Sequence, residues 1–484
     1  MKLKELLVGL DVLELHADPE TEIAAVCHDS RKVTEDALFV AISGFAADGH
    51  KFIPMAQEKG AVVVVCERKP ENGSYVLVKD SRLALALLGA NWFDHPAEKM
   101  TMIGITGTNG KTTSTYLLKH ILEKTRKAKV GLVGTIQNMI GDEVLETERT
   151  TPESFELQEL FKKMYDAGCT HVIMEVSSHA LVLSRVAGVR FQAGLFTNLT
   201  QDHLDFHKTM EEYRKAKSLL FSVCDTGAIN LDDPAAKAMI AEAKCPVITY
   251  TMQGAQADLV ADDLLLQSRG VSFDASFEGR KERVDLHIPG KFSVYNALGV
   301  CAVALNLGLS LPEIADALAD ATGVRGRAEV VPTPGKDYTV LVDYSHTPDS
   351  LENILKTARE FCQGKLIAVF GCGGDRDPIK RPIMGRVGAE LADLVVVTSD
   401  NPRTEDPMKI IGQVEEGVKE KNTPYVVIEN RREAIRWAMD HAGAGDVIIL
   451  AGKGHETYQE IGHEKFHLDD REEVILHLKE LENQ

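Results

Sequence analysis

Short apolar runs alternate with amphipathic stretches along most of the chain. Continuous apolar runs predict buried strands, because parallel strands covered on both faces carry little polar alternation. In the middle of the chain these runs are Met102–Thr106, Lys129–Val133, His171–Val176 and Ala193–Thr197. Helical spacing lies between them, at Lys111–Lys124 and Ser154–Ala167 among others. This alternation predicts a parallel sheet with crossover helices.

The N-terminal part of the chain forms a separate block. A strand run at Ala61–Cys66 precedes helical spacing over Ser81–Phe93, which His95 and Pro96 interrupt. Proline cannot continue a helix, so we expect a linker at Asp94–Lys99.

A second boundary follows the central block. Asp258–Pro289 alternates like antiparallel strands, and helices are expected at Phe292–Leu307 and Leu311–Ala321 before the chain reaches Arg327. Beyond it, strands and helices alternate again, at Thr339–Val342, Leu351–Phe361, Leu366–Phe370, Leu394–Thr398, Val426–Ile428, Glu433–His441 and Val447–Ala451. The pattern predicts an α/β protein of three domains, at residues 1–97, 98–328 and 329–484, the last of them Rossmann-like.

Composition narrows the function classes. The 484 residues carry a formal charge of −19, which repels phosphate polymers and argues against a general nucleic-acid binder. The apolar runs are too short to span a membrane, and Asp11 interrupts the N-terminal one, so we expect no membrane insertion and a cytoplasmic location. The eight cysteines form no C-x-x-C pair and are interpreted as small buried hydrophobic residues.

A glycine-rich segment follows the strand at Met102–Thr106 and opens the next helix. It runs Gly104-Ile105-Thr106-Gly107-Thr108-Asn109-Gly110-Lys111-Thr112-Thr113. This context is typical of a loop whose backbone N–H groups bind phosphates, although the spacing departs from G-x-x-x-x-G-K-[ST]. Lys111 could reach the β- and γ-phosphates of a nucleotide, and Thr112 could bind Mg²⁺.

Two polar clusters follow the next strands of the same block. Glu175-Val176-Ser177-Ser178-His179 ends one strand, and Asn198-Leu199-Thr200-Gln201-Asp202-His203-Leu204-Asp205 ends another. Ligands of doubly wound sheets gather at the carboxyl ends of the strands, so both clusters should face the phosphate loop. Taken alone, each side chain would more often be a capping or solvated residue. Their placement at the ends of neighbouring strands favours ligation, so Glu175 and a histidine are candidate Mg²⁺ ligands beside Thr112.

Two further motifs suggest other chemistry. His463-Glu464-Lys465-Phe466-His467 fits the H-E-x-x-H pattern of zinc proteases, but its surroundings predict strand, turn and strand instead of the helix that zinc binding requires. Gly371-Cys372-Gly373-Gly374 begins a G-x-G-x-x-G pattern, whose last glycine position is Arg376. We therefore expect neither zinc nor a dinucleotide at these places.

The chemistry-bearing segments together resemble the Mur ligase family of peptidoglycan synthesis. They are Asp29-Ser30-Arg31, the loop Gly107–Thr112, Glu175–His179, Asp202–Asp205, Asp343-Tyr344-Ser345-His346-Thr347-Pro348 and Gly452-Lys453-Gly454-His455-Glu456. The resemblance covers nearly the whole chain, in order. It implies an N-terminal domain that binds a UDP-linked substrate, a central ATPase domain, and a C-terminal domain that binds an amino acid.

Within the family, Asp400-Asn401-Pro402-Arg403 is similar to the motif of the members that add diaminopimelate instead of lysine to UDP-N-acetylmuramoyl-L-alanyl-D-glutamate. The implied reaction uses ATP and Mg²⁺ and passes through an acyl phosphate. Lysine addition, a folylpolyglutamate synthetase and a non-enzymatic ATP-dependent switch are the alternatives. Oligomeric state is not implied, and a monomer is the default.

The resemblance also implies roles for individual residues. Lys111, Lys217 and His203 would be catalytic, and Lys217 would carry a carbamate derived from CO₂, although the residue pattern alone suggests a surface lysine on a helix. The implied metal ligands are Thr112, Glu175, His203 and Lys217. The implied ATP contacts are Gly107, Thr108, Asn109, Gly110, Lys111, Thr112, Thr113, Asn296, Arg327 and Asp343.

Two substrate sites follow from the same resemblance. The UDP-linked substrate would contact Ser30, Phe45, Ala46, Ala47, Thr150, Thr151, Ser177 and Arg185. Diaminopimelate would contact Arg376, Asp400, Asn401, Pro402, Arg403, Gly452 and Glu456, with Arg403 on its distal carboxylate. Leu183 departs from the family, since some members have a glutamine contact there. ATP would be shared between the central and C-terminal domains, so closure of the latter should gate turnover.

Overall fold

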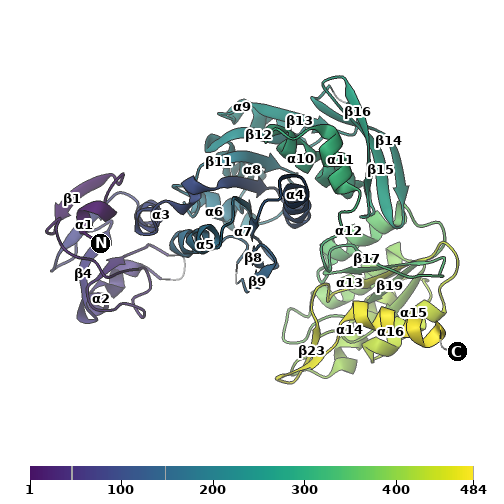
Figure 1. The fold of residues 1–484 in the computed structure, drawn as a ribbon. Helices are drawn as coiled ribbons and strands as arrows, with labels where there is room; N and C mark the ends of the chain where they lie inside the picture. The colour runs from purple at the N-terminus through teal and green to yellow at the C-terminus, as the bar shows by residue number, and fades with distance from the viewer. Residues whose placement is uncertain (45–46, 148, 255, 483–484) are drawn as a thin grey trace. The chain divides into compact units, whose positions relative to one another are not determined.

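The computed structural model describes residues 1–44, 47–147, 149–254 and 256–482. The chain folds as two compact units, the first mainly residues 1–251 and the second mainly residues 260–298 and 311–484, with residues 299–310 belonging to the first. Among the described residues, strands fall into four groups, at residues 12–78, 101–286, 329–451 and 458–467. Figure 1 shows these groups in the order of the chain.

The first unit begins with a small five-stranded sheet in the order β1-β5-β4-β3-β2. β1 is antiparallel to β5 and the other pairs are parallel. The strands are β1 (Val12–His16), β2 (Ala25–Cys27), β3 (Ala37–Val40), β4 (Ala61–Cys66) and β5 (Tyr75–Val78), and the helices are α1 (Leu3–Leu6), α2 (Ile53–Glu58) and α3 (Ser81–Trp92). Asp80 caps α3, and a short 3₁₀ turn at Pro96–Lys99 follows it, as the proline predicted.

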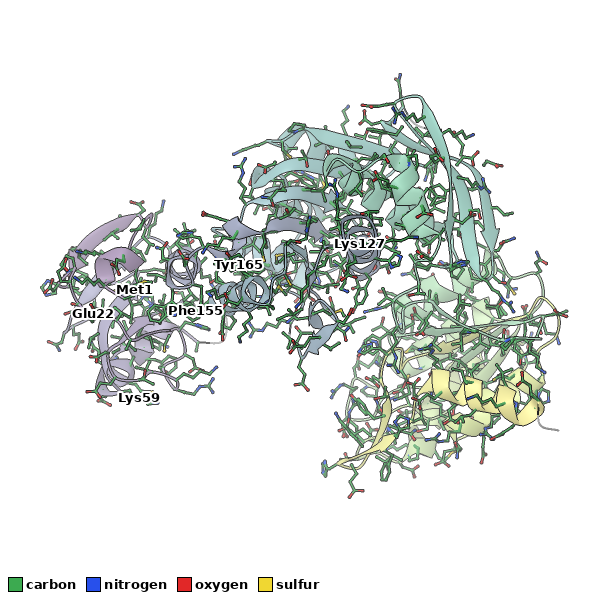
Figure 2. The ribbon with its side chains drawn as sticks, in the orientation of Figure 1. Met1, Glu22, Lys59, Lys127, Phe155 and Tyr165 are labelled. Atoms are coloured by element: carbon green, nitrogen blue, oxygen red, sulfur yellow. The ribbon has the colours of Figure 1, made fainter. Side chains whose placement is uncertain are left out.

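The helix α3 packs on the next part of the same unit. Phe155 of α5 (Ser154–Asp166), labelled in Figure 2, packs against Phe93 with ring centroids 5.2 Å apart and ring planes tilted by 51°, and its ring also lies against Gly89 of α3. The apolar contact joins the N-terminal sheet to the central one.

A mainly parallel sheet forms the rest of the first unit. Its strands run in the order β13-β12-β11-β6-β10-β7-β8-β9. They are β6 (Thr101–Thr106), β7 (Val130–Val133), β8 (Asn138–Ile140), β9 (Glu143–Leu145), β10 (His171–Glu175), β11 (Phe191–Phe196), β12 (Cys224–Asn230) and β13 (Val247–Thr251). The helices are α4 (Lys111–Arg126), α5 (Ser154–Asp166), α6 (Ser178–Val182), α7 (Leu204–His207), α8 (Met210–Ser218) and α9 (Ala236–Glu242).

The order of these strands places the predicted site. β6 lies between β10 and β11 and is parallel to both. The strands that follow β6 in the chain therefore lie on both of its sides, which makes β6 a switch point of the sheet. Ligands bind at the carboxyl ends of strands at such a switch point. The loops that follow β6, β10 and β11 carry the phosphate loop and the two predicted polar clusters.

The second unit starts with long antiparallel strands, as the alternation predicted. They are β14 (Leu259–Gln267), β15 (Gly270–Phe277) and β16 (Arg280–Leu286), adjacent in the order β16-β15-β14. α10 (Lys291–Asn306) follows, and α11 (Leu311–Leu318) packs on β16. The helix α11 ends three residues before the predicted limit, ahead of Gly323, where the backbone has left the helical form.

A six-stranded sheet forms the rest of the second unit, in the order β17-β18-β22-β19-β20-β21. Its strands are β17 (Glu329–Val331), β18 (Thr339–Asp343), β19 (Leu366–Phe370), β20 (Leu394–Val397), β21 (Tyr425–Val427) and β22 (Val447–Ala451), and β23 (Tyr458–Ile461) and β24 (Glu464–His467) form a hairpin. The helices are α12 (Pro348–Arg359), α13 (Lys380–Leu391), α14 (Pro407–Val418), α15 (Arg431–Asp440) and α16 (Asp470–Glu482). All pairs except β17 with β18 are parallel, which confirms the Rossmann-like prediction.

Two hydrophobic layers cover this sheet. Residues of α12, α13 and α14 pack with Leu341 and Ala368 on one face, whereas α15 and α16 pack with Val340 and Ile367 on the other. The helix α12 begins three residues earlier than predicted, because Thr347 and Ser350 form a reciprocal cap.

Candidate active site

The phosphate loop connects β6 to α4 and is held by the segment after β11. Asn198 accepts the backbone N–H of Thr108 at its carbonyl oxygen (2.8 Å) and that of Asn109 at its side-chain oxygen (2.9 Å). Gly107 has φ 147°, and a Cβ there would lie 1.9 Å from Thr197 Oγ1, so a larger residue does not fit. Gly110, with φ 85°, precedes the first turn of α4, where Thr113 is buried. The backbone thus has the form that the sequence predicted.

Two lysines converge on one carbonyl oxygen of this loop. Lys111 Nζ lies 3.0 Å from Gly107 O and 2.9 Å from Thr108 O, and Lys217 Nζ donates to the same Gly107 O at 2.8 Å. Lys217 lies on α8 but is only 2% exposed, so the interpretation as a surface lysine is wrong. Burial and the charge of Lys111 hold the pKa of Lys217 well below its ordinary value, while Asp202 opposes the shift.

Glu175, at the end of β10, is the buried carboxylate of the site. It is 0% exposed and accepts hydrogen bonds from Thr112 Oγ1 (2.9 Å), Thr135 N (3.0 Å) and Thr135 Oγ1 (2.8 Å). In the described part of the chain no lysine, arginine or histidine forms an ion pair with it. A buried carboxylate whose partners are all neutral fits a cation at this place.

The other two expected metal ligands share a tyrosine. Lys217 Nζ lies 4.4 Å from the centre of the Tyr213 ring, and the His203 ring lies 6.1 Å from it. His203 is half exposed, has φ 52° and stacks edge-on against His179. The expected ligands therefore form two contacting groups, Thr112 with Glu175, and His203 with Lys217 around Tyr213.

The residues expected to hold the muramoyl-dipeptide lie beside Glu175. Thr151 Oγ1 donates to the Glu175 carbonyl oxygen (2.8 Å) and accepts the Ser177 N–H (3.2 Å). Arg185 Nη1 donates to Thr151 O at 3.1 Å, and Thr150 Oγ1 lies 3.1 Å from the hydroxyl of Thr135. All four predicted residues, Thr150, Thr151, Ser177 and Arg185, thus meet in one cluster.

The other positions expected to contact the UDP-linked substrate lie in the N-terminal part of the chain. Ser30 is buried in the N-terminal sheet region and Ala47 is exposed, whereas Phe45 and Ala46 lie outside the described residues. Leu183 caps α6, and its backbone N–H donates to His179 O (2.8 Å). Its apolar side chain cannot replace a glutamine hydrogen bond.

Three expected ATP contacts belong to the second unit. Asn296 is 4% exposed, and its Nδ2, like Arg327 Nε, has no hydrogen-bond partner among the described residues. Arg327 lies over the Tyr344 ring at 5.5 Å. Asp343 accepts the Ala328 N–H at 2.7 Å, and burial raises the pKa of its carboxyl group. Buried donors without partners are a reason to expect a ligand.

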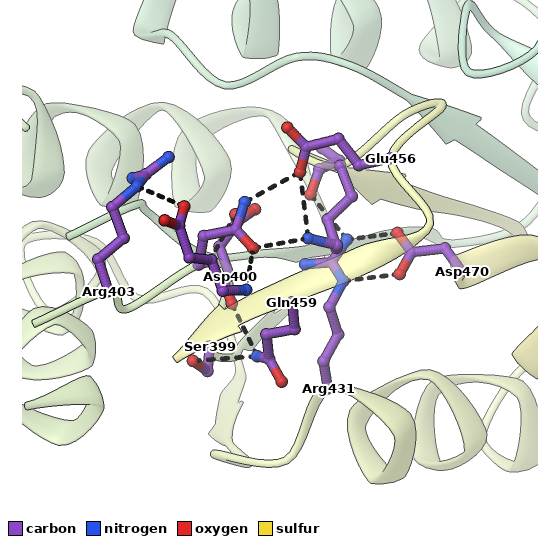
Figure 3. A network of polar contacts seen from close by, with 11 residues as sticks. Ser399, Asp400, Arg403, Arg431, Glu456, Gln459 and Asp470 are labelled. Carbon is purple, nitrogen blue, oxygen red and sulfur yellow. Dashed lines mark hydrogen bonds and ion pairs between the residues drawn. The ribbon is translucent and has the colours of Figure 1, made fainter. Parts of the chain in front are cut away.

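The residues expected to bind diaminopimelate cluster at the carboxyl end of the six-stranded sheet (Figure 3). Arg403 donates to Glu460 Oε2 (2.9 Å) and Gly374 O (2.8 Å), and Asn401 Nδ2 donates to Glu456 Oε2 (2.9 Å). Arg403 follows Pro402 with φ 51°.

Glycines bring the remaining members of this cluster close. A Cβ on Gly452 would lie 2.5 Å from Asp400 Oδ2, and one on Gly373 would lie 2.9 Å from Arg403 Nη1 and 4.0 Å from Arg376 Cγ. Arg376 itself is exposed and donates to Asp375 O. The seven predicted residues therefore lie in the loops that follow β19, β20 and β22.

Several residues of these sites were missed by sequence reasoning. Thr135 holds Glu175, Tyr213 joins His203 to Lys217, and Lys453 holds Asn401 and Glu456. The residue types carry no local signal for these roles. Only Lys453 had a signal in the sequence, because it lies between two glycines directly after a predicted strand.

The segment with the H-E-x-x-H pattern has the secondary structure that the sequence predicted. His467 lies in β24 and His463 in the turn before it, so the H-E-x-x-H segment is a hairpin, as predicted. Among the described residues, no three His, Cys, Asp or Glu side chains gather as a preformed metal site.

Two predictions from composition concern the whole fold. None of the helices described here has the length and apolar character needed to cross a membrane. The eight cysteines are free thiols, five of them buried.

Three family models match the chain. They are described as "Mur ligase family, catalytic domain" at residues 22–86, "Mur ligase middle domain" at residues 105–304, and "Mur ligase, glutamate ligase domain" at residues 326–454.

Full-length relatives and solved structures agree with these models. A UDP-N-acetylmuramoyl-L-alanyl-D-glutamate–2,6-diaminopimelate ligase of Clostridium acetobutylicum is 50% identical over 485 residues, covering 99% of this chain and 100% of that protein. A protein of the same name from Clostridium botulinum is 51% identical, covering 95% and 96%. A solved structure of that name is 31% identical with TM-score 0.78, covering 100% of both chains. A folylpolyglutamate synthase of Thermotoga maritima, at 19% identity and TM-score 0.59, shares the fold, covering 76% of this chain and 90% of that one.

Proposed function

The chain belongs to the Mur ligase family, and from this premise we propose that it adds meso-2,6-diaminopimelate to UDP-N-acetylmuramoyl-L-alanyl-D-glutamate at the expense of ATP. The observation that carries the proposal is about half identity over the full length of relatives named for this activity. The reaction would serve the synthesis of peptidoglycan precursors in the cytoplasm.

The chemistry has two steps. A carboxylate is a poor acyl donor, so the γ-phosphoryl group of ATP passes to the γ-carboxylate of D-glutamate, which gives an acyl phosphate and ADP. An amino group of diaminopimelate then attacks the acyl carbon, the amide forms and inorganic phosphate leaves. Phosphoryl transfer depends mainly on positioning and on neutralising charge.

The first unit supplies the groups for phosphoryl transfer. Because Asn198 accepts the N–H groups of Thr108 and Asn109, the phosphates would contact the N–H groups of the first turn of α4, from Gly110 on, and Lys111 would supply a cation there. Thr150, Thr151, Ser177 and Arg185 would orient the acceptor carboxylate next to Glu175.

The oxygen donors of the site fit Mg²⁺. Thr112 and the buried Glu175 would hold one ion, since hydroxyl and carboxylate oxygens are its preferred ligands and Glu175 has neutral partners among the described residues. When bound, Mg²⁺ neutralises anionic phosphate oxygens and so favours transfer of the phosphoryl group.

Lys217 would carry a carbamate in the working enzyme. Its lowered pKa favours the neutral amine, whose lone pair can attack the carbon of CO₂, with formation of an N–C bond and loss of one proton. The product is a buried carboxylate beside Tyr213 and His203, which would suit a second Mg²⁺.

Arg403 would select the amino acid. Diaminopimelate carries a carboxylate at its distal end that lysine lacks, and a guanidinium group binds a carboxylate with two parallel hydrogen bonds. Within the described residues, Arg403 uses Nε for Glu460 and one N–H of Nη1 for Gly374, which leaves the second N–H of Nη1 and both N–H groups of Nη2 for a ligand.

A substrate-dependence assay separates this proposal from its alternatives. ADP release should require both the UDP-muramoyl-dipeptide and diaminopimelate. Release without either would favour an ATP-dependent switch, and release with a folate and glutamate would favour folylpolyglutamate synthesis. Either result would overturn the proposal.

A further inference from the structure

Lys453 is a fully buried lysine without an assigned task in the proposed reaction. It follows Gly452 after β22 and is 0% exposed. Its Nζ lies 3.0 Å from Asn401 Oδ1 and 3.2 Å from Glu456 Oε2, two residues expected to contact diaminopimelate. Glu456 is labelled in Figure 3. Lysine is almost never fully buried unless it is paired, so this ammonium belongs to the structure of the site.

The ammonium fixes the orientation of the Asn401 side-chain amide. Asn401 Oδ1 accepts from Lys453 Nζ and from the backbone N–H of Glu460 at 2.9 Å. Because both groups are donors, the atom between them must be the amide oxygen. Asn401 Nδ2 therefore faces Glu456 Oε2 at 2.9 Å, and its second N–H is left for another acceptor.

The same ammonium acts on Glu456. Lys453 Nζ and Asn401 Nδ2 both contact Oε2, and in the described part of the chain Oε1 receives no donor. The Glu456 side chain is 16% exposed, and Oε1 can still accept a hydrogen bond from a ligand. The contact with the ammonium orients the carboxylate, and a carboxylate binds an ammonium group through charge-assisted hydrogen bonds.

We propose that Lys453 is a positioning residue for the amino acid: it orients the Glu456 carboxylate for an amino group of diaminopimelate and directs an Asn401 N–H toward a carboxylate of the same substrate. This inference rests on the proposed function and adds a residue to its amino-acid site. The substrate's distal end carries both groups, so a pair of opposite polarity beside Arg403 recognises its zwitterion.

The test compares steady-state kinetics of the full-length parent, Lys453→Met, Glu456→Gln and the double variant. In Lys453→Met, KM for diaminopimelate should rise about 10- to 100-fold, while KM for ATP and for the UDP-substrate stay within about twofold. Because Lys453 acts mainly through Glu456, and the Glu460 N–H still holds the Asn401 oxygen when Lys453 is absent, the KM of the double variant should stay within tenfold of that of Glu456→Gln alone. The exposed Lys465, whose Nζ lies 4.1 Å from the centre of the neighbouring Tyr458 ring, gives the matched control Lys465→Met with parental kinetics.

The other possible results separate failure of the proposed function from failure of the positioning role. A parent that forms no product with diaminopimelate overturns the proposed function and this inference with it. An active parent whose Lys453→Met variant keeps the parental KM for diaminopimelate overturns the positioning role alone. Removal of Lys453 leaves the charge of Glu456 uncompensated, so the single variant can fail to fold; the double variant lacks that charge. A double variant with a KM at least tenfold above that of Glu456→Gln also contradicts the inference.

Discussion

Replacement of Glu175 by glutamine separates the charge of this residue from its hydrogen bonds. The parent carboxylate accepts bonds from two hydroxyls and one backbone N–H, at 2.8 to 3.0 Å. Glutamine keeps the oxygen that Thr135 N and Thr112 contact, and the Thr135 hydroxyl can turn to accept from the new amide. The unfolding free energy should therefore change by no more than about 1 kcal/mol.

The effect on catalysis should be much larger. A carboxylate that helps to hold Mg²⁺ on a transferring phosphoryl group contributes several kcal/mol, so kcat should fall about 10³-fold and half-saturation by Mg²⁺ should move to higher concentration. The assay is ADP release at saturating substrates during Mg²⁺ titration. Thr135→Val, which removes a neutral bond to the same carboxylate, should cost less than about tenfold. Turnover of Glu175→Gln within tenfold of the parent, with the same Mg²⁺ dependence, would refute the metal role.

Three further predictions concern separate parts of the chain. Lys217→Ala should be nearly inactive and should recover with an added short carboxylic acid, whereas Lys215→Ala on the exposed side of α8 should keep parental activity; absence of rescue would count against the carbamate. Arg403→Ala should lose most of the preference for diaminopimelate over lysine, about 10⁴ in kcat/KM, with little change in KM for ATP; a retained preference would place selectivity elsewhere. Arg381 holds the pKa of Glu405 at about 2, below its ordinary 4.5, so this carboxylate stabilises the fold above pH 4.5 and loses that effect as the pH falls toward 2. The midpoint of urea unfolding should drop over this pH range, and less steeply in Glu405→Gln; equal slopes would show that other groups cause the drop.

Contiguous features of the protein could be predicted from the sequence. The phosphate loop is one segment of strand, glycines and helix, so its form depends on neighbours in the chain. The central strands, the antiparallel segment and the hairpin at Tyr458–His467 were also visible, because their periodicity is local. Limits of helices differed by up to three residues where side-chain caps decided them, as at Thr347.

Burial and distant pairings could not be predicted from residue pattern. Lys217 lies on a charged helix and becomes buried because its Nζ meets a carbonyl oxygen 110 positions earlier in the chain. Lys453 meets Asn401 across 52 positions, a pairing that only the order of strands in the sheet creates. For Lys217 the resemblance to a family indicated a role that the spacing of residues did not; for Lys453 the resemblance marked the segment Gly452–Glu456 but gave this lysine no role.

The most direct test of the central claim is product formation from a mixture of amino acids. The parent enzyme is incubated with ATP, Mg²⁺, UDP-N-acetylmuramoyl-L-alanyl-D-glutamate and equal concentrations of meso-diaminopimelate, lysine and glutamate, and the nucleotide-linked products are identified by mass. The account predicts one product, larger than the acceptor by one diaminopimelate less water, formed with one ADP per molecule. A lysine or glutamate adduct as the main product, or ADP release without any adduct, would contradict it.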